Sequence, residues 1–345
     1  MAISMRTIAG RTGLSTATVS MALRGIGRIP EETRQRVRAA AEELGYQVSP
    51  ILSRAFQLAR QPERSRYKET LALILEFPLE AEAMYQNSIY ENAMKGGERL
   101  GYKVDAFHVS GNPAEQRRYN RILLARGIRG LIILPRLEHR FPRLHLDWSR
   151  YAAVEIGRTL WNPRGLHRVE RPVYHEILET FHLLKKAGYR RIGMAVEPTA
   201  DKNRQMVYTA AAKVAQEQFP HKQMIPPLSG FGPWEEGTFR AWYERFRPDV
   251  LIIHATIEVP GWAAGLGLRV PEDISIFGCN VGNSTVSGLT SNTVLLAENS
   301  VEMLSILLER DQIGLAEAPY NWMVRGIWQN GNTLARPIDK FPAPF

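Results

Sequence analysis

Residues 5–23 read MRTIAGRTGLSTATVSMAL, and this stretch decides how the N-terminal part of the chain folds. Helical spacing of its apolar residues predicts two short helices, which Gly13 separates. Ala9 lies on the first helix and Val19 on the second. A small residue lets two helices approach, glycine allows a tight turn, and an apolar pair fixes the crossing angle. The stretch therefore predicts a helix-turn-helix.

A third helix is expected to follow. Pro30 suits a first helical turn, and Glu31 and Glu32 suit the positive end of a helix dipole. Apolar residues at helical spacing then run from Val37 to Leu44. Any small helical bundle would show the same spacing, so the pattern alone leaves both interpretations open.

The charge of the chain is unevenly distributed. The 345 residues carry a formal net charge of +9, with 44% hydrophobic and 23% charged residues. Residues 1–66 hold 11 Arg and 5 Glu without Lys or Asp, a net charge of +6, which leaves +3 for the remainder. A basic head on a nearly neutral body indicates an anionic polymer as partner, and a solvated basic surface is the alternative.

The composition also argues against several classes of protein. Cys279 is the only cysteine, which excludes a disulfide framework. The first residues lack the pattern of a secretory signal, and no run of about 18 apolar residues occurs. We therefore expect a cytoplasmic protein without membrane contact.

After the head, the pattern changes to alternating strands and helices. The expected strands are 70–75, 104–109, 130–134, 152–156, 192–196, 249–253 and 274–277, and the expected helices are 85–100, 113–126, 177–186, 204–219 and 235–246. Two successive runs of such units predict an α/β body of two doubly wound lobes, with a ligand crevice at the carboxyl ends of the strands. The expected domains are a helix-turn-helix head at 1–47, a hinge or linker at 48–68 and the two-lobed body at 69–345.

Residues 5–23 resemble the signature of the lactose-repressor (LacI/GalR) family, and residues 32–46 are similarly close to its third helix. Further segments, 188–193, 247–249 and 270–275, stand in the order typical of the family. The resemblance implies a homodimeric, sequence-specific transcription regulator, expected to be a repressor. Its partners would be double-stranded DNA with a pseudo-palindromic operator and a small effector, a sugar or sugar derivative, bound by a periplasmic-binding-protein-like body without a cofactor or metal.

In the family the second helix enters the major groove of DNA. The resemblance implies base-edge contacts from Thr16, Ala17, Ser20 and Met21. Phosphate contacts are expected from Arg6, Thr18, Arg24, Arg28 and Arg34. Relatives often carry arginine where this chain has Met21, so an apolar contact such as a thymine methyl replaces guanine readout there.

The family's hinge folds on DNA and inserts a leucine into the minor groove. Ala55 occupies the matching position here, and Leu52 or Phe56 could serve after a shift of register. Alternatively, Leu52 and Phe56 pack two hinge helices of a dimer together.

The resemblance also indicates an effector pocket. Its expected residues are Tyr85, Arg204, Trp234, His254, Thr256 and Asn280. Arg204 matches the pocket arginine of the family and is expected to begin a helix, although a bridge to Asp201 is an alternative role. Thr256 and Asn280 stand where relatives have aspartate, which removes strong acceptors for sugar hydroxyls.

Two other classes of protein remain as alternatives. A solute-binding protein of the transport class would share the body but not the basic head. A sugar-processing enzyme would need a catalytic constellation, and the sequence has no phosphate-binding loop, metal-binding helix motif or serine elbow. The pair His175-Glu176 lies on an expected helix, and we predict that both side chains are exposed.

Overall fold

The computed structural model describes residues 5–23, 29–44, 68–76, 84–136, 143–217, 219–254, 258–282 and 285–338. The chain divides into two compact units, Met1–Arg66 and Tyr67–Phe345.

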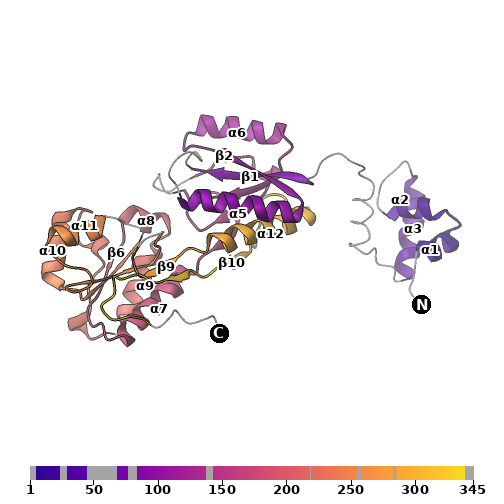
Figure 1. The fold of residues 1–345 in the computed structure, drawn as a ribbon. Helices are drawn as coiled ribbons and strands as arrows, with labels where there is room; N and C mark the ends of the chain where they lie inside the picture. The colour runs from indigo at the N-terminus through magenta and orange to yellow at the C-terminus, as the bar shows by residue number, and fades with distance from the viewer. Residues whose placement is uncertain are drawn as a thin grey trace. The chain divides into compact units, whose positions relative to one another are not determined.

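The described part of the first unit is helical. It contains α1 (Met5–Thr12), α2 (Thr16–Leu23) and α3 (Glu31–Glu43) (Figure 1). Gly13 has a φ of +67°, which glycine adopts without steric cost, and Leu14 N donates to Ala9 O at 3.2 Å across the turn. Ala9 and Val19 are buried in one apolar cluster with Ile8. The predicted helix-turn-helix is confirmed.

Helix α3 completes this small core. It begins after Pro30, with Glu31 and Glu32 in its first turn as expected. Val37 and Ala41 are buried against the helix-turn-helix pair. The three helices thus share one apolar core.

The first lobe of the second unit is built on a parallel sheet. Its six strands have the order β10-β5-β4-β3-β1-β2. They are β1 (Glu69–Leu75), β2 (Tyr102–His108), β3 (Gly130–Ile133), β4 (Ala152–Ile156), β5 (His167–Glu170) and β10 (Asn321–Met323). Helices α5 (Met84–Leu100) and α12 (Thr293–Glu309) cover one face, and α6 (Pro113–Ala125) covers the other. Both faces of the sheet are covered because side chains alternate along β1, so that Leu73 packs in one apolar layer and Ile74 in the other.

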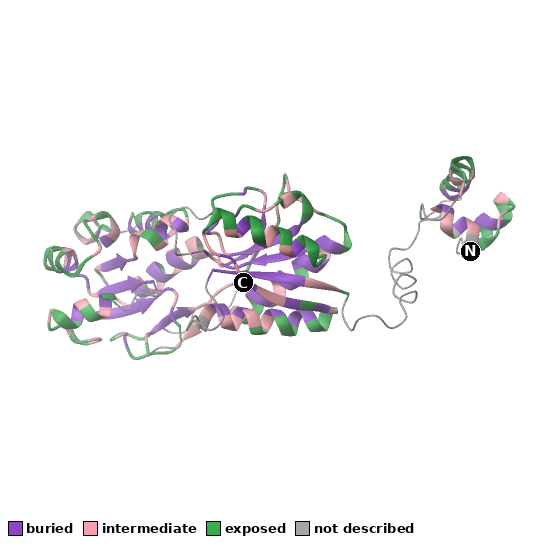
Figure 2. Cartoon of the chain, turned by 90° about the horizontal axis from the view of Figure 1, so that it is seen from above, coloured by how far each residue is buried: buried purple, intermediate pink, exposed green. Residues whose placement is uncertain are grey.

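The second lobe repeats the plan around a five-stranded sheet. The strand order is β11-β9-β8-β7-β6, and only β11 runs antiparallel, to β9. The strands are β6 (Ile192–Ala195), β7 (Val250–Ile253), β8 (Ser275–Gly278), β9 (Gly288–Thr290) and β11 (Ile327–Gln329). Helices α7 (Val173–Lys186) and α9 (Val207–Gln216) cover one face, and α10 (Glu236–Phe246) and α11 (Glu258–Gly265) cover the other. In both lobes the central strands are buried and the helices expose their outer sides (Figure 2), whereas the short edge strands β10 and β11 are largely exposed or half-buried. The short helices are α8 (Pro198–Asn203), η1 (Trp148–Arg150), η2 (His221–Gln223) and η3 (Leu228–Gly230).

The two doubly wound lobes are confirmed, but their division along the chain is not consecutive. After β9 in the second lobe, α12 returns to pack on α5 of the first lobe, and β10 then pairs with β5. The chain finally crosses back to form β11. It therefore passes between the lobes three times, near residues 171, 292 and 325.

One predicted helix is wrong. The expected helix 204–219 is replaced by α8 and α9, with Arg204 as the C-cap of the first. Gln205 and Met206 have φ values of 59° and 61°, which interrupt the helix. The buried carboxylate of Asp201 then accepts from Tyr208 N at 3.0 Å and caps the start of α9. The break places Arg204 in a connection rather than at a helix start.

No helix among the described residues is long and apolar enough to cross a membrane. Within the same described ranges, no group of three or more His, Cys, Asp or Glu side chains is placed to hold a metal ion.

Candidate functional site

The surface of α2 is the candidate DNA-reading element. Val19 and Ala22 are buried in the head, whereas Thr16 is exposed and Met21 is partly exposed. The hydroxyl of Ser15 accepts from Thr18 N at 3.0 Å, so Ser15 caps the helix. Thr16 and Met21 therefore lie on the side of α2 that is free of the core.

The other predicted DNA contacts are placed only in part. The backbone of Arg6, Ala17 and Ser20 lies on α1 and α2, but nothing further is described of these side chains. Arg24, Arg28 and the hinge residues Leu52, Ala55 and Phe56 lie outside the described residues. Thr18 is partly exposed, and its hydroxyl is hydrogen-bonded to the hydroxyl of Ser15 at 2.8 Å.

Arg34 has a local structural role as well. Its side chain is only 17% exposed, and Nε donates to Ile29 O at 3.2 Å. Its Nε also lies 3.9 Å from a carboxylate oxygen of Glu31. These contacts use part of the hydrogen-bonding capacity of the Arg34 guanidinium to stabilise the start of α3.

The second unit contains an interlobe cavity of about 820 Å³. Its walls include the residues that follow the carboxyl ends of β3, β4, β7 and β8, and all three crossings between the lobes contribute. Ligands of open α/β sheets bind at the carboxyl ends of strands. Four predicted pocket residues line it: Tyr85, Arg204, His254 and Asn280. Thr256 lies outside the described residues.

Trp234 and Phe231 are not brought to this cavity. Trp234 packs against Trp262, with ring centroids 5.2 Å apart, in the apolar layer beneath α10 and α11. Phe231 packs edge-on against Phe246 in the same layer. Trp242 is fully buried in that layer.

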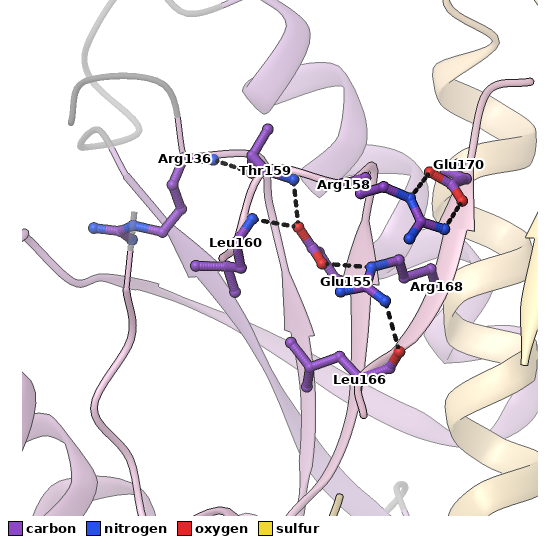
Figure 3. A network of polar contacts seen from close by, with 8 residues as sticks. All are labelled: Arg136, Glu155, Arg158, Thr159, Leu160, Leu166, Arg168 and Glu170. Atoms are coloured by element: carbon purple, nitrogen blue, oxygen red, sulfur yellow. Dashed lines mark hydrogen bonds and ion pairs between the residues drawn. The ribbon is translucent and has the colours of Figure 1, made fainter. Parts of the chain in front are cut away.

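The first-lobe wall of the cavity is fixed by a buried polar network, shown in Figure 3. Oε1 of Glu155 accepts from Thr159 N at 2.7 Å and from Leu160 N at 2.8 Å, and its Oε2 accepts from Arg168 Nε at 2.9 Å. The hydroxyl of Thr159 accepts from Arg136 N at 2.8 Å. These bonds hold the loop after β4 in one conformation.

The same wall carries a paired charge. Arg158 donates to both carboxylate oxygens of Glu170, at 3.1 and 2.5 Å (Figure 3). Such a two-bond pair is strong and geometrically specific. Glu170 is also the one carboxylate lining the described part of the cavity, and Arg158 occupies two of its roughly four acceptor positions.

Arg171 occupies the first crossing and connects several elements. Its Nη2 donates to Glu176 at 2.7 Å and to Cys279 O at 3.0 Å, and its Nη1 donates to Asn280 Oδ1 at 3.1 Å. Its Nε has no hydrogen-bond partner in the part of the chain that the structure describes. Glu176 is buried, contrary to the prediction, because it pairs with Arg171 and accepts from Gly326 N at 2.7 Å. His175 is exposed and lines the cavity.

Arg204 lines the cavity from the second lobe and has no acidic partner among the described residues. Its hydrogen bond is a long one, from Nη1 to Ala200 O at 3.4 Å. Asp201, the alternative partner, instead accepts from the backbone of Tyr208 and Thr209. The bridge to Asp201 is therefore not formed.

His254 lies at the base of the second-lobe wall. It is 6% exposed, its ring centroid is 4.9 Å from that of Tyr208, and its Nε2 has no partner among the described residues. Burial and then the charges of Arg204 and Arg171 hold the pKa of His254 well below its usual value, so the imidazole is neutral at pH 7. Burial likewise raises the pKa of Tyr85.

Sequence reasoning missed the Glu155–Arg168 and Arg171–Glu176 pairs. The available signal was an acid inside the apolar strand 152–156, where an unpaired carboxylate would be costly. Nothing in the sequence pattern named its partner, because the pairing depends on strand neighbours.

Comparisons with known proteins agree with this architecture. Residues 4–49 match the family described as bacterial regulatory proteins, lacI family, and residues 181–326 match the periplasmic binding protein-like domain. The HTH-type transcriptional repressor PurR of Klebsiella pneumoniae (strain 342) is 24% identical over 337 residues, covering 89% of this chain and 90% of that protein. PurR of Shigella sonnei is 25% identical over 304 residues, covering 81% of this chain and 82% of that protein.

Solved structures show the same fold. The lac repressor dimer bound to operator and the anti-inducer ONPF is 19% identical, with a TM-score of 0.57 and coverage of 97% of this chain and 100% of that chain. The complex of the transcriptional regulator CelR with cellobiose is 18% identical, with a TM-score of 0.58 and coverage of 96% and 100%.

The described residues form a helix-turn-helix head and a two-lobed body with an interlobe cavity, the parts of a DNA-binding protein with a ligand site. The head matches the lacI family of bacterial regulatory proteins and the body a periplasmic binding protein-like domain, and this combination is that of a transcription regulator. The relatives named above are regulators rather than enzymes.

Proposed function

We propose that this protein is a homodimeric repressor that binds a pseudo-palindromic operator and changes its operator affinity when a small molecule occupies the interlobe cavity. The observation that carries the proposal is the combination of a lacI-type head with a cavity whose walls come from both lobes. The protein acts by binding rather than by catalysis, in the cytoplasm where its DNA lies.

The head supplies the sequence specificity. Base-edge contacts come from Thr16, Ala17, Ser20 and Met21 on α2. Hydroxyls serve as donors or acceptors in the major groove, and Met21 supplies an apolar contact. Phosphate contacts come from Arg6, Thr18, Arg24, Arg28 and Arg34, with Arg34 contributing less because its guanidinium holds α3.

The hinge contributes a further contact. We assign residues 48–68 to the hinge, with Leu52, Ala55 and Phe56 as its minor-groove or dimer-packing positions. The head and body are then the segments 1–47 and 69–345.

The cavity supplies the control. Arg158 belongs to the first lobe, and Arg204 and His254 belong to the second, so one ligand bridges the two lobes. A ligand shifts an equilibrium only by its difference in affinity between the two states. Because the lobes share the ligand, their relative arrangement is the state that it selects.

Selection of bound sites from random DNA tests the proposal. We expect the purified protein to enrich a pseudo-palindrome, and sedimentation of the complex to show two chains per site. Enrichment of no motif, or a stable monomer at micromolar concentration both with and without DNA, contradicts it. A solute-binding protein of the same body fold would shift no DNA at all.

A further inference from the structure

Arginines outnumber carboxylates in the described lining of the interlobe cavity. Three arginines line it there, Arg158, Arg171 and Arg204, against one carboxylate, Glu170. That carboxylate already accepts two bonds from Arg158. The other acceptors of the described lining are neutral hydroxyl and amide oxygens, so it offers Arg204 no carboxylate of its own.

Asn280 does not restore acceptor capacity. Its Oδ1 already accepts from Arg171 Nη1 at 3.1 Å and from Ser291 Oγ at 2.9 Å. A carbonyl oxygen has two lone pairs, so only the amide N–H groups of Asn280 remain for a ligand.

Two cationic groups of the cavity walls lack acceptors that a ligand could supply. Arg204 has no carboxylate within ion-pair distance among the described residues, and its hydrogen bond to Ala200 O is 3.4 Å long. The Arg171 side chain is 8% exposed, and its buried Nε has no partner among the described residues either. Burying a donor without an acceptor is costly, so both groups favour a ligand that accepts.

Arg171, Arg204 and His254 line one and the same cavity. Burial and then the charges of Arg204 and Arg171 lower the pKa of His254, so its imidazole adds no positive charge to this wall. Among the three arginines of the described lining, Arg158 pairs with Glu170 and Arg171 with Glu176, and Arg204 is the one without a carboxylate partner.

The rest of the cavity wall is largely apolar. The apolar and aromatic side chains that line it include Tyr85, Ile156, Val173, Tyr174, Val207 and Leu296. A ligand that fills this space therefore has an apolar body as well as an acceptor group.

We propose that the effector is a small monocarboxylic acid with an apolar body, whose carboxylate pairs with Arg204 and accepts from Arg171. A planar carboxylate matches the guanidinium fork with two parallel bonds and neutralises one charge. This inference rests on the proposed function, because it names the class of molecule that the regulator senses. It differs from the sequence-based expectation of a sugar.

The test compares each acid with its uncharged isostere. Thermal unfolding and calorimetry are measured on the full chain with phenylacetate and phenylacetamide, and with hexanoate and hexanamide. D-glucose, D-glucuronate and phenyl phosphate complete the set, within a wider library of small metabolic acids and neutral sugars. We expect apolar acids to raise the unfolding midpoint and to bind, and their amides to bind at least tenfold more weakly.

Variants then locate the contact. Arg204→Gln should lower the affinity for the tightest-binding acid by roughly 30-fold or more. Arg204→Lys keeps the positive charge but lacks the paired N–H groups of the guanidinium, so it should lower that affinity less. Lys213→Gln is the matched control, because Lys213 is an exposed cation on α9 that does not line the cavity. Its affinity for the acid should equal that of the wild type. Unfolding of each variant without ligand verifies that it folds.

The proposal is overturned if a neutral sugar, an amide, a phosphate ester or glucuronate raises the midpoint more than every apolar acid. It is equally overturned if no acid in the library raises the midpoint, or if Arg204→Gln binds the acid as the wild type does. Operator binding is measured separately. Loss of operator binding with intact acid binding would refute the proposed function alone, whereas operator binding that responds to a neutral sugar would refute this inference alone.

Discussion

Replacing Arg168 by methionine should unfold the body at much lower denaturant concentration. The side chain of Glu155 is fully buried, and its Oε2 has Arg168 Nε at 2.9 Å as its partner. Arg168→Met keeps most of the side-chain volume but leaves a buried carboxylate unpaired. Removal of one partner of a buried ion pair costs about 3–5 kcal/mol, so we expect the free energy of unfolding to fall by about that amount.

The assay is urea unfolding followed by tryptophan fluorescence. All 7 tryptophans lie beyond residue 66, so the signal reports the body alone. The control is the double variant Glu155→Gln/Arg168→Met. The glutamine carbonyl oxygen still accepts from Thr159 N and Leu160 N, as Oε1 of Glu155 does, but no buried charge remains. We expect the double variant to recover at least about half of the lost stability.

The loss should also depend on pH. Burial raises the pKa of Glu155 in the folded protein, and Arg168 opposes that rise. Without Arg168 the folded-state pKa is higher still, so the folded variant binds a proton that the unfolded chain releases above its pKa of about 4.3. The variant should therefore lose stability as pH rises from about 5, by up to about 1.4 kcal/mol per pH unit. If Arg168→Met lowers the free energy of unfolding by less than about 1 kcal/mol, or by an amount that does not change with pH, the assigned role of the Glu155–Arg168 pair is wrong.

Three further predictions concern other parts of the chain. Operator affinity should fall as the salt concentration rises, with a log–log slope of roughly −5 or steeper, because two heads of net charge +6 neutralise several phosphates. Arg24→Ala should weaken binding to all DNA sequences alike, and an operator affinity that does not change with salt would contradict this assignment. Met21→Arg should change the preferred base at one position of each half-site in a repeated selection, and an unchanged motif would remove Met21 from the base-reading set. Cys279 is 3% exposed and burial raises its pKa to about 12, so Ellman's reagent at pH 8 should modify it only when urea unfolds the body; fast labelling of the folded protein would count against the described packing.

The sequence predicted the head well because its helices follow local rules. Gly13, Ser15 and the spacing of Ala9 and Val19 all lie within one short segment, and each does what helix capping and packing rules require. The early strands of the body were also predictable, because each is a short apolar run between helical patterns.

The elements that sequence reasoning missed depend on distant partners. Strands β9, β10 and β11 have three residues each, too few for any periodicity to appear. The return of α12 to the first lobe is a matter of topology, which no local pattern encodes.

The sequence identified site residues whose own chemistry suits a pocket, and it missed residues whose role depends on distant partners. Arg204 and His254 line the cavity, but the helix break that places Arg204 occurs at Gln205 and Met206, neither of which is a glycine. Trp234 is an aromatic residue before a helix, and such a residue is as well suited to a core as to a ligand. Arg171 was not predicted, because its role comes from contacts with residues more than 100 positions away.

The operator affinity of the full chain, measured with and without a cavity ligand, tests most directly whether the cavity controls DNA binding. The operator is the palindrome obtained by selection, labelled for fluorescence anisotropy, at one fixed salt concentration. Each acid that raises the unfolding midpoint should also change the operator Kd by about fivefold or more, which is the lower range of typical allosteric coupling. Arg204→Gln should abolish both responses to the acid, and Lys213→Gln should keep both. An acid that binds the wild-type cavity tightly and leaves the operator Kd unchanged would contradict the claim that the cavity controls DNA binding.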